Sequence, residues 1–434
     1  MSSEEKKESP PSAPSSPKTT STATTAGGRA SLLARPNVLC LEPYRCARDD
    51  YDTGVLLDAN ENAYGPTSLP TNSLNPYDNS MELERYPCPY QREVKQLLCD
   101  YRNSKTMAAA ASTTTTTTGG KDDGGGGGGG GTTTTTATGG GMITPENVFC
   151  GVGSDEAIDL LIRIFCRPGG GEGGDAIMIT PPTYGMYKVC ANVNDVSIQA
   201  VPLTEDFDLR VAEMLRAVTP STKLIFVCSP GNPTSKSVPL SEIRRLASSP
   251  LYRGLVVVDE AYVDFSGTPS ATSLVAEHDN VVVLQTLSKA FGLAGIRCGF
   301  AIGPPDVIRL MNNVKAPYNV SKLTSDAAIN ALRNTPTLEG HVSEILEQRE
   351  VVARELESFD FVLRVYHSDA NFLLFRVRQK ANELYKIMAD RGVVSRFRGR
   401  EMHCDECIRV TIGKPEENRK FLDLLQSVYA EIAS

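Results

Sequence analysis

Lys289 is the residue of this chain whose surroundings most constrain its chemistry. It stands in the run Thr286–Gly292 (TLSKAFG), with Arg297 shortly after it and Asp259 before it. A lysine forms an imine with an aldehyde only from its neutral amine, so it needs surroundings that lower its pKa, such as partial burial beside other cations. The neighbouring serine and arginine fit such surroundings. We therefore interpret Lys289 as a lysine that forms a Schiff base.

Pyridoxal phosphate is the aldehyde cofactor whose needs these residues meet. Its pyridinium nitrogen needs a carboxylate partner, and its phosphate needs hydrogen-bond donors. Asp259 follows the apolar stretch Val256–Val258 and can supply the carboxylate, although a cap for the following segment is the structural alternative. A buried Asp needs a cation or donors, and a pyridinium N–H would be one. Ser288 and Arg297 can donate to the phosphate.

A second phosphate-binding feature precedes a helical pattern. The stretch Gly151–Glu156 (GVGSDE) comes directly before the amphipathic stretch 157–162. It would place free backbone N–H groups and the Ser154 hydroxyl at a helix N-terminus, which favours anions. Taken alone the pattern is weak, because Ser154 or Asp155 could simply cap the helix. Combined with the lysine and arginine above, it favours a phosphate site.

Three further residues are candidates for contacts with the cofactor ring. Asn232, in the stretch Ser229–Thr234 (SPGNPT), could belong to an ordinary turn, but it follows an apolar strand pattern. Asn232 and Tyr262 can both donate to the phenolic oxygen of the cofactor. Tyr184 offers a flat face on which the ring can stack, although a single Tyr is more often part of a core.

Two arginines near the C-terminus are candidates for binding a substrate anion. Arginine recognises carboxylate and phosphate through two parallel hydrogen bonds. Arg409 lies inside an apolar strand pattern, where an unpaired charge would be costly, so we expect it to bind an anion with Arg396 nearby. Surface ion pairing is the alternative, and it is the plausible interpretation for Arg398 and Arg400.

The alternation of short apolar strands with amphipathic helices predicts an α/β fold with a mostly parallel sheet. The expected strands are Ala176–Ile179, Leu224–Cys228, Leu255–Val258 and Val281–Gln285. In such sheets ligands bind beyond the carboxyl ends of the strands. Asn232, Asp259 and Lys289 each follow a different strand, so we expect them to converge.

Length and composition exclude several classes of function. A chain of 434 residues is long enough for a large domain and a smaller one. The net charge is −8 and the basic residues are scattered, which argues against a nucleic-acid partner. No apolar run approaches the roughly 18 residues of a membrane-spanning helix. We expect a protein that binds neither nucleic acid nor membrane.

The cysteines indicate a reducing compartment and no metal site. The eleven cysteines are an odd number, and several sit in apolar segments where cysteine behaves as a small hydrophobic residue. Cys404 and Cys407 follow His403, but no second ligand pair with zinc spacing exists. The N-terminal tail is rich in Ser, Thr and Pro, as in a transit peptide, but its acidic start favours a disordered cytoplasmic tail.

The chain resembles the fold-type I aminotransferases, and within them the histidinol-phosphate aminotransferases, most of all the fungal form. The resemblance runs from about Val38 to the C-terminus, interrupted by the Thr/Gly-rich stretch. It rests on Leu41–Asp50, Leu57–Asn62, Arg85–Pro87, Gly153–Glu156, Val258–Tyr262 and Ala316–Asn319.

This resemblance implies a large domain, whose mostly parallel sheet is sandwiched by helices, and a smaller α+β domain. We expect a disordered tail at residues 1–30, followed by a segment at 31–84 that joins the small domain. The cofactor-binding domain would span 85–320, and the small domain 321–434. Within the large domain, the Thr and Gly runs of residues 104–141 predict a disordered insertion.

The resemblance also implies a reaction. It is the transfer of an amino group between L-histidinol phosphate and 2-oxoglutarate, giving imidazole-acetol phosphate and L-glutamate, in L-histidine biosynthesis. Tyr86, in an Arg-Tyr-Pro motif, would reach the cofactor phosphate of a neighbouring subunit, which implies a homodimer. Arg409, assisted by Arg396, would receive the substrate phosphate or the glutamate carboxylate, with Tyr64 and Asn371 as weaker candidates. The roles of the cofactor residues would be those given above.

Two alternatives keep the cofactor and change the reaction: decarboxylation of a phosphorylated amino acid, and transamination of aromatic amino acids. A non-catalytic regulator that binds the cofactor is a third. The chain departs from the family at Ser235, where glycine usually follows Asn-Pro-Thr. A left-handed backbone there would cost a non-glycine residue about 1 kcal/mol. We expect a local adjustment without loss of activity.

Overall fold

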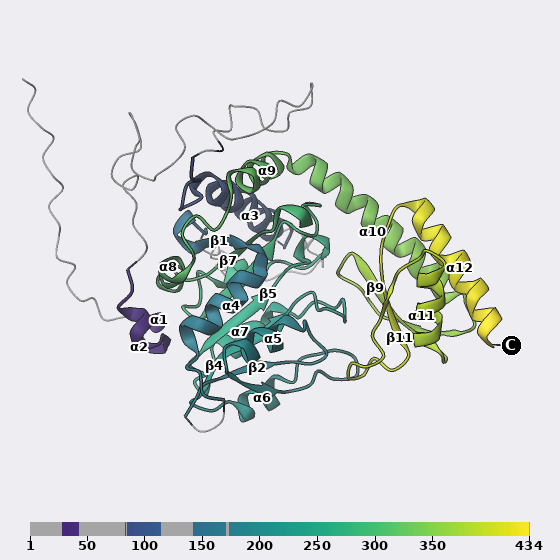
Figure 1. The fold of residues 1–434 in the computed structure, drawn as a ribbon, viewed down its shortest axis with the longest axis horizontal. Coiled ribbons are helices and arrows are strands. Elements are labelled where there is room, and N and C mark those ends of the chain that lie inside the picture. The colour runs from purple at the N-terminus through teal and green to yellow at the C-terminus, as the bar shows by residue number, and fades with distance from the viewer. Residues whose placement is uncertain (1–27, 43–82, 84, 114–141, 171–172, 434) are drawn as a thin grey trace, which may run out of the picture.

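The computed structural model describes residues 28–42, 83, 85–113, 142–170 and 173–433. Nearly all of the predicted N-terminal tail and most of the predicted insertion therefore lie outside the described residues. Within them the chain forms a larger domain around one sheet and a smaller domain around another (Figure 1). No helix of the described part is long and apolar enough to cross a membrane.

A seven-stranded sheet forms the centre of the larger domain. Across the sheet the strands are β1 (Val148–Val152), β7 (Cys298–Ile302), β6 (Val281–Thr286), β5 (Leu255–Asp259), β4 (Thr222–Cys228), β2 (Ala176–Ile179) and β3 (Ser197–Ala200). Strand β7 is antiparallel to β1 and β6, while the other neighbouring pairs are parallel. The predicted α/β class with a mostly parallel sheet is confirmed.

Both faces of this sheet are buried because its central strands are apolar throughout. In β5, Val256 and Val258 face one hydrophobic core, while Leu255 and Val257 face the other. Successive side chains of a strand point to opposite faces of the sheet, and here the side chains on both faces are apolar and must be buried. The sheet must therefore lie between two layers of helices, and the polar residues that follow each strand are left at its edge.

Helices cover both faces of the sheet. The first core receives side chains from α3 (Arg92–Thr113), α6 (Val211–Ala217), α7 (Leu240–Ala247) and α9 (Lys322–Arg333). The second receives them from α1 (Arg29–Leu33), α2 (Pro36–Leu39), α4 (Gly153–Phe165), α5 (Met186–Val193) and α8 (Pro305–Val314). Short 3-10 turns complete the connections: η3 (Pro145–Asn147), η4 (Val263–Phe265), η5 (Ala271–Leu274) and η6 (Ala294–Ile296).

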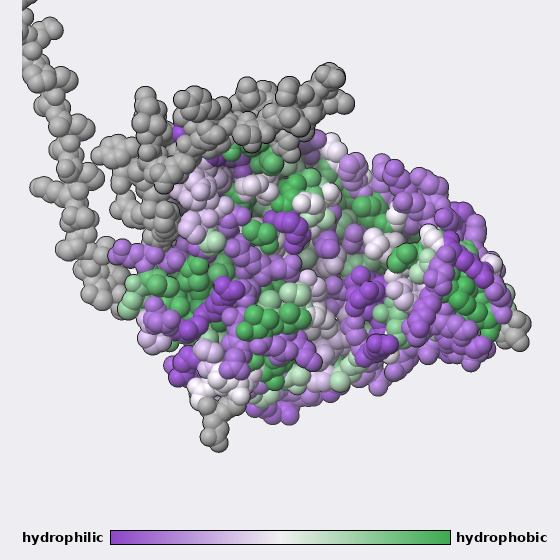
Figure 2. All heavy atoms as spheres, in the orientation of Figure 1, coloured by the Kyte–Doolittle hydropathy of each residue, from purple (hydrophilic) through white to green (hydrophobic). Residues whose placement is uncertain are grey.

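The smaller domain is a four-stranded antiparallel sheet with helices. Its strands, in order, are β10 (Arg396–Phe397), β11 (Cys407–Thr411), β9 (Phe372–Val377) and β8 (Val362–Val365). The helices are α10 (Thr335–Glu357), α11 (Ala381–Asp390) and α12 (Pro415–Ala433). Figure 1 shows α10 running from the larger domain to the smaller one, and in Figure 2 its outer face is mostly hydrophilic. The domain has its own core of buried residues.

The structure corrects three boundaries expected from the sequence. Helix α3 continues to Thr113, so the start of the Thr/Gly stretch at residue 104 is helical and not disordered. Residues 29–39 contact α8 of the larger domain, so the beginning of the segment 31–84 does not join the small domain, while residues 43–82 of that segment lie outside the described residues. Helix α9 packs on α3 in the larger domain, so the small domain begins in α10 and not at residue 321. The Thr/Gly composition does not show where α3 ends, and neither the resemblance nor a local pattern shows which core a helix faces.

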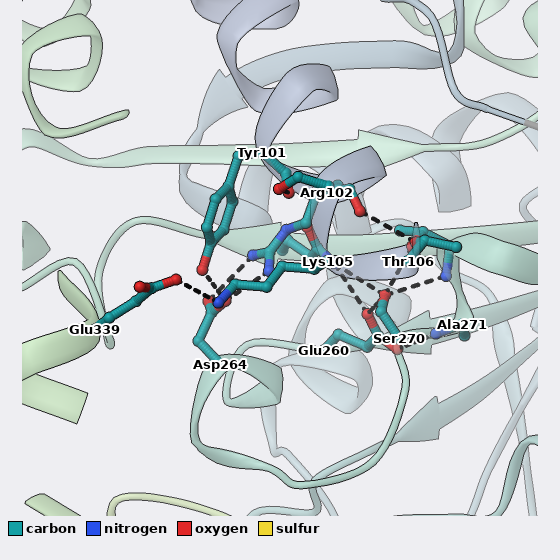
Figure 3. Close-up of polar contacts among 12 residues, drawn as sticks. Tyr101, Arg102, Lys105, Thr106, Glu260, Asp264, Ser270, Ala271 and Glu339 are labelled. Carbon is teal, nitrogen blue, oxygen red and sulfur yellow. Dashed lines mark hydrogen bonds and ion pairs between the residues drawn. The ribbon is translucent and has the colours of Figure 1, made fainter. Parts of the chain in front are cut away.

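A buried ion pair ties α3 to the turn after β5. Both nitrogens of the Arg102 fork donate to the Asp264 carboxylate, at 2.5 and 3.1 Å, and Tyr101 donates to the same carboxylate at 3.2 Å. The side chains of Arg102 and Asp264 are only 6% and 8% exposed. Figure 3 shows them pointing toward each other, with the Lys105–Glu339 pair beside them. Asp264 closely follows the candidate cofactor residues, so this pair anchors their turn.

Replacing Asp264 with alanine should lower the free energy of unfolding by about 3–5 kcal/mol, because the Arg102 charge would stay buried without its partner. Glu339→Ala is the matched control. It breaks the Lys105 pair, whose side chains are about half exposed, and should cost less than ~1 kcal/mol. Urea denaturation of both variants measures the difference. Equal losses would contradict the anchoring role of the buried pair.

Candidate active site

A cavity of 480 Å³ lies beyond the carboxyl ends of the central strands, against the smaller domain. Most of the predicted site residues line it: Ser154, Asp155, Tyr184, Asn232, Asp259, Tyr262, Ser288, Lys289, Arg297, Arg396 and Arg409. Larger cavities exist elsewhere in the described residues, at the opposite edge of the sheet and beside α3. This cavity alone among the three gathers a lysine, a buried carboxylate and several arginines.

Lys289 lies just after β6 and lines the cavity. Partial burial, followed by the charges of Arg409 and Arg297, lowers the pKa of its amine. The side chain remains partly accessible to solvent, which lets a substrate reach it. Its Nζ lies 5.5 Å from the centre of the Tyr262 ring. The amine is therefore more readily neutral than that of an exposed lysine, as an imine-forming lysine requires.

Asp259 ends β5 as a buried carboxylate, 3% exposed. Burial raises its pKa to about 6, although a hydrogen bond from the Tyr187 hydroxyl at 2.7 Å favours the ionised form. The Ala261 N–H adds a longer bond of 3.3 Å to the other oxygen. A cation placed against this carboxylate would stabilise its ionised form, because the attraction between the two charges is strong away from water. A pyridinium N–H would be such a cation.

Helix α4 begins at the cavity wall with its first turn facing the cavity. Its N-cap is Val152, which makes no side-chain cap hydrogen bond. The alternative that Ser154 or Asp155 caps the helix is therefore wrong, and both residues lie in the first turn and line the cavity. The first N–H groups of a helix lack partners within the helix and favour anions. This end of α4 can receive a phosphate.

Arg297 stands beside the start of α4. Its Nη2 lies 3.3 Å from the Asp155 carboxylate, and its Nη1 donates to the Ser288 hydroxyl at 3.2 Å. Strand β7 passes very close, since a Cβ at Gly299 would lie 2.3 Å from the Ser154 nitrogen. A glycine is needed there for sheet and helix to meet. One guanidinium, one hydroxyl and the helix end thus surround the same space.

Tyr184, Asn232 and Tyr262 lie around the cavity between Asp259 and the arginines. Tyr184 donates to Asp155 at 3.0 Å. Asn232 accepts a hydrogen bond from Arg409 at 2.5 Å. Burial raises the pKa of Tyr262 to about 12, so its hydroxyl remains a donor at neutral pH. The three polar side chains can orient a flat ring above Asp259.

Three arginines of the smaller domain reach the same cavity. Arg396 and Arg409 are directly opposite each other on β10 and β11, which places their side chains on one face. Burial, then the charge of Arg398, lowers the pKa of Arg409. Arg398 is paired with Glu401 at 2.8 Å. Three guanidinium groups gathered on this side of the cavity can bind a further anion.

The cavity does not include every predicted site residue. Tyr86 lies outside it, half exposed, with its ring stacked on Tyr318 at a centroid distance of 4.5 Å. Asn371 is not among the lining residues, and its carbonyl accepts from the Ile412 N–H. Tyr64 lies outside the described residues.

The comparisons with known proteins agree with this geometry. Residues 139–425 match the family of class I and II aminotransferases. The chain is 41% identical over 417 residues to the histidinol-phosphate aminotransferase of Candida maltosa, covering 92% of this chain and 98% of that one. It is also 41% identical over 414 residues to that of Schizosaccharomyces pombe, covering 92% and 97%. The chain belongs to the class I and II aminotransferases, among the histidinol-phosphate aminotransferases.

A solved structure shares the fold of this aminotransferase. The histidinol-phosphate aminotransferase from Sinorhizobium meliloti, solved in complex with pyridoxal-5'-phosphate, superposes with a TM-score of 0.66. The alignment covers 86% of this chain and 90% of that one, at 20% identity. At that identity the likeness supports the fold. The roles of the side chains rest on the geometry above.

Sequence reasoning missed several residues of this aminotransferase site. Arg398 was interpreted as a surface residue, but it lines the cavity and is 19% exposed. The signal was its spacing from Arg396, because residues two apart in extended backbone share a face, and Arg398 directly follows β10. Tyr187 was missed because a tyrosine on an apolar helix face gives no sign of a distant carboxylate. The remaining lining residues are Cys228, Ala261, Thr286 and Ala294.

Asp259→Asn should stabilise the cofactor-free protein at neutral pH while abolishing activity. The folded-state pKa of about 6 lies above the ordinary 3.8, so the folded state binds the proton more tightly than the unfolded chain. Ionised Asp259 therefore costs stability, and this cost grows as pH rises from about 4 to above 6, reaching about 3 kcal/mol. Denaturation of both proteins across this range measures the difference. A difference that does not vary with pH would contradict the burial argument.

Proposed function

We propose that this protein transfers an amino group between L-histidinol phosphate and 2-oxoglutarate, giving imidazole-acetol phosphate and L-glutamate, in L-histidine biosynthesis. The physiological direction would be toward histidinol phosphate. The observation that carries the proposal is that a lysine with a lowered pKa and a buried carboxylate share one cavity with four arginines, three of them from the smaller domain. The extent and identity of the match to the two yeast enzymes support it.

The residues of the cavity fit pyridoxal phosphate. The donor set is the evidence: a carboxylate for the ring nitrogen, a reactive lysine for the aldehyde, and a helix end with an arginine for the phosphate. Asp259 would hold the proton on the ring nitrogen. Ser154, Ser288 and Arg297 would bind the phosphate, with Asp155 orienting the arginine.

When bound, pyridoxal phosphate supplies an electron sink for the charge left on a substrate carbon that loses a proton. Lys289 would carry that proton, because it lines the cavity and the pKa of its amine is lowered. Asn232 and Tyr262 would donate to the phenolic oxygen, and Tyr184 would lie against the ring. These residues orient the ring so that Lys289 reaches one face of the substrate carbon.

The arginines would select the substrate. Arg409 with Arg396 would bind the phosphate of histidinol phosphate in one half-reaction and a glutamate carboxylate in the other. A dianion gains more than a monoanion from several guanidinium groups in a partly dehydrated cavity. This favours a phosphorylated substrate over an aromatic amino acid. Asn371 and Tyr64 remain weaker candidates for this pocket.

The proposal extends to assembly and location. A homodimer would place Tyr86 against the cofactor phosphate of a neighbouring subunit, and its position outside its own cavity is compatible with that role. The cysteines of the described residues are unpaired, as expected in the cytoplasm, where thiols stay reduced. Sedimentation of the active enzyme as a monomer would overturn the shared site.

The function is tested by adding L-histidinol phosphate to protein loaded with pyridoxal phosphate and following the cofactor absorbance. We expect the lysine-linked band to be lost and then restored by 2-oxoglutarate. Lys289→Ala should lose turnover by several orders of magnitude and keep its fold, because the proton carrier is gone. Near-normal transamination by that variant would contradict the role proposed for Lys289. Carbon dioxide release without 2-oxoglutarate would select the decarboxylase alternative.

Arg398→Met should raise the KM for L-histidinol phosphate at least about tenfold, because a charge-assisted hydrogen bond contributes roughly 1.5–3 kcal/mol. Arg400→Met is the matched control, since Arg400 is exposed and does not line the cavity. Steady-state kinetics of both variants measures the effect. The same KM in both variants would place Arg398 outside the substrate site.

A further inference from the structure

Ser235 is completely buried and holds its backbone in the left-handed region, with φ of 59°. This conformation is unfavourable for a residue with a Cβ. From the sequence we expect a local adjustment at Ser235, but its backbone keeps the left-handed conformation. Contacts with neighbouring residues must therefore hold Ser235 in this conformation. Its surroundings show what does: Ser235 lies where the loop after β4 meets the turn between β8 and β9 of the smaller domain.

Hydrogen bonds join this loop to that turn. The Ser235 hydroxyl lies 2.9 Å from the His367 carbonyl and 2.6 Å from the Thr234 carbonyl, so its one proton is shared between the two. The Asp369 N–H donates to the Ser235 carbonyl at 2.8 Å, and the Ser237 N–H donates to the Asp369 carboxylate at 2.8 Å. We name these contacts the Ser235 clasp.

The clasp closes a ring of contacts around the cavity. The same loop presents Asn232, which accepts from Arg409 at 2.5 Å. The turn that Ser235 binds leads into β9, where Leu374 is paired with Arg409 of β11. Thus Asn232 contacts Arg409 directly, while Ser235, in the same loop, is bonded to the turn that leads into the sheet carrying Arg409.

We propose that Ser235 is a positioning residue: its clasp fixes the arginines of the smaller domain at the distance from the cofactor residues that the substrate requires. The proposal rests on the proposed function, since it concerns the site where the substrate anion binds. If the smaller domain occupies its binding position in only a fraction of the molecules, the apparent affinity for substrate falls in proportion to that fraction. Weakening the clasp should therefore raise KM and leave kcat nearly unchanged.

Two substitutions separate the hydroxyl from the backbone. Ser235→Ala removes the hydroxyl and keeps the Cβ, whereas Ser235→Gly removes both and relieves the left-handed conformation. We expect both to raise the KM for L-histidinol phosphate by about fivefold, the factor that one ordinary hydrogen bond contributes. The glycine variant should melt at a higher temperature than the alanine variant, because its backbone is unstrained.

Ser237→Ala is the matched control in the same loop. Its hydroxyl contacts Ser266 of the larger domain at 3.1 Å, while its N–H still reaches Asp369. This variant should keep the KM of the unaltered protein. A second variant, Asp369→Ala, removes the acceptor on the other side of the clasp and should reproduce the rise in KM.

Hydrogen exchange reports the clasp without any substrate. The amides of Asp369 and Ser237 should exchange faster in Ser235→Ala and Ser235→Gly than in Ser237→Ala. Faster exchange with no turnover of histidinol phosphate in the unaltered enzyme would support the clasp and reject the proposed function. Unchanged exchange and unchanged KM in both Ser235 variants would overturn the clasp. A rise in KM in the alanine variant alone would also overturn it, because strain would then be the cause.

Discussion

A carboxylate buried at the end of the central strand is the constraint on which the rest of this structure depends. Asp259 has lost nearly all contact with water, and its ionised form is held by the Tyr187 hydroxyl and one backbone N–H. Such a group is costly unless a cation joins it. The parallel sheet provides the place, because its strand ends open into a cavity. The buried Arg102–Asp264 pair keeps the following turn in position.

The site divides its electrostatic tasks between the two domains. The larger domain supplies a buried carboxylate, a lysine, Arg297 and the start of α4, whereas the smaller domain supplies the other three arginines. Burial, followed by repulsion from neighbouring arginines, lowers the pKa of Lys289 and of Arg409. The positive charges that can attract a substrate anion therefore also help to lower the pKa of Lys289. Bringing the two domains together is part of making the lysine reactive.

This division explains why the contact between the domains needs specific hydrogen bonds. A hydrophobic contact alone would hold the smaller domain near the cavity without setting the position of its arginines, because such contacts have little directionality. The bonds around Ser235 are directional and partly buried, and they lie in the loop that also carries Asn232. The unfavourable backbone of Ser235 is compatible with a stable fold because several bonds hold it there.

Sequence by itself determined the chemistry and the class of fold. Apolar strands that end in polar residues predicted a mostly parallel sheet, and the residues after its strands, Asn232, Asp259 and Lys289, do converge on one cavity. Their types and spacing follow local rules: a strand has a two-residue period, and the residues that end it lie at the edge of the sheet.

Only the tertiary structure decided which distant residues complete the site. Tyr187 reaches Asp259 from another element, and Arg398, which directly follows the short strand β10, is held beside β11 by a bond from its N–H to the Cys407 carbonyl. Packing also decided that α9 belongs to the larger domain and that α3 continues to Thr113. A local pattern records which face of an element is apolar. It does not record what that face meets, because packing partners are far apart in the chain and are chosen by the shape of the whole core.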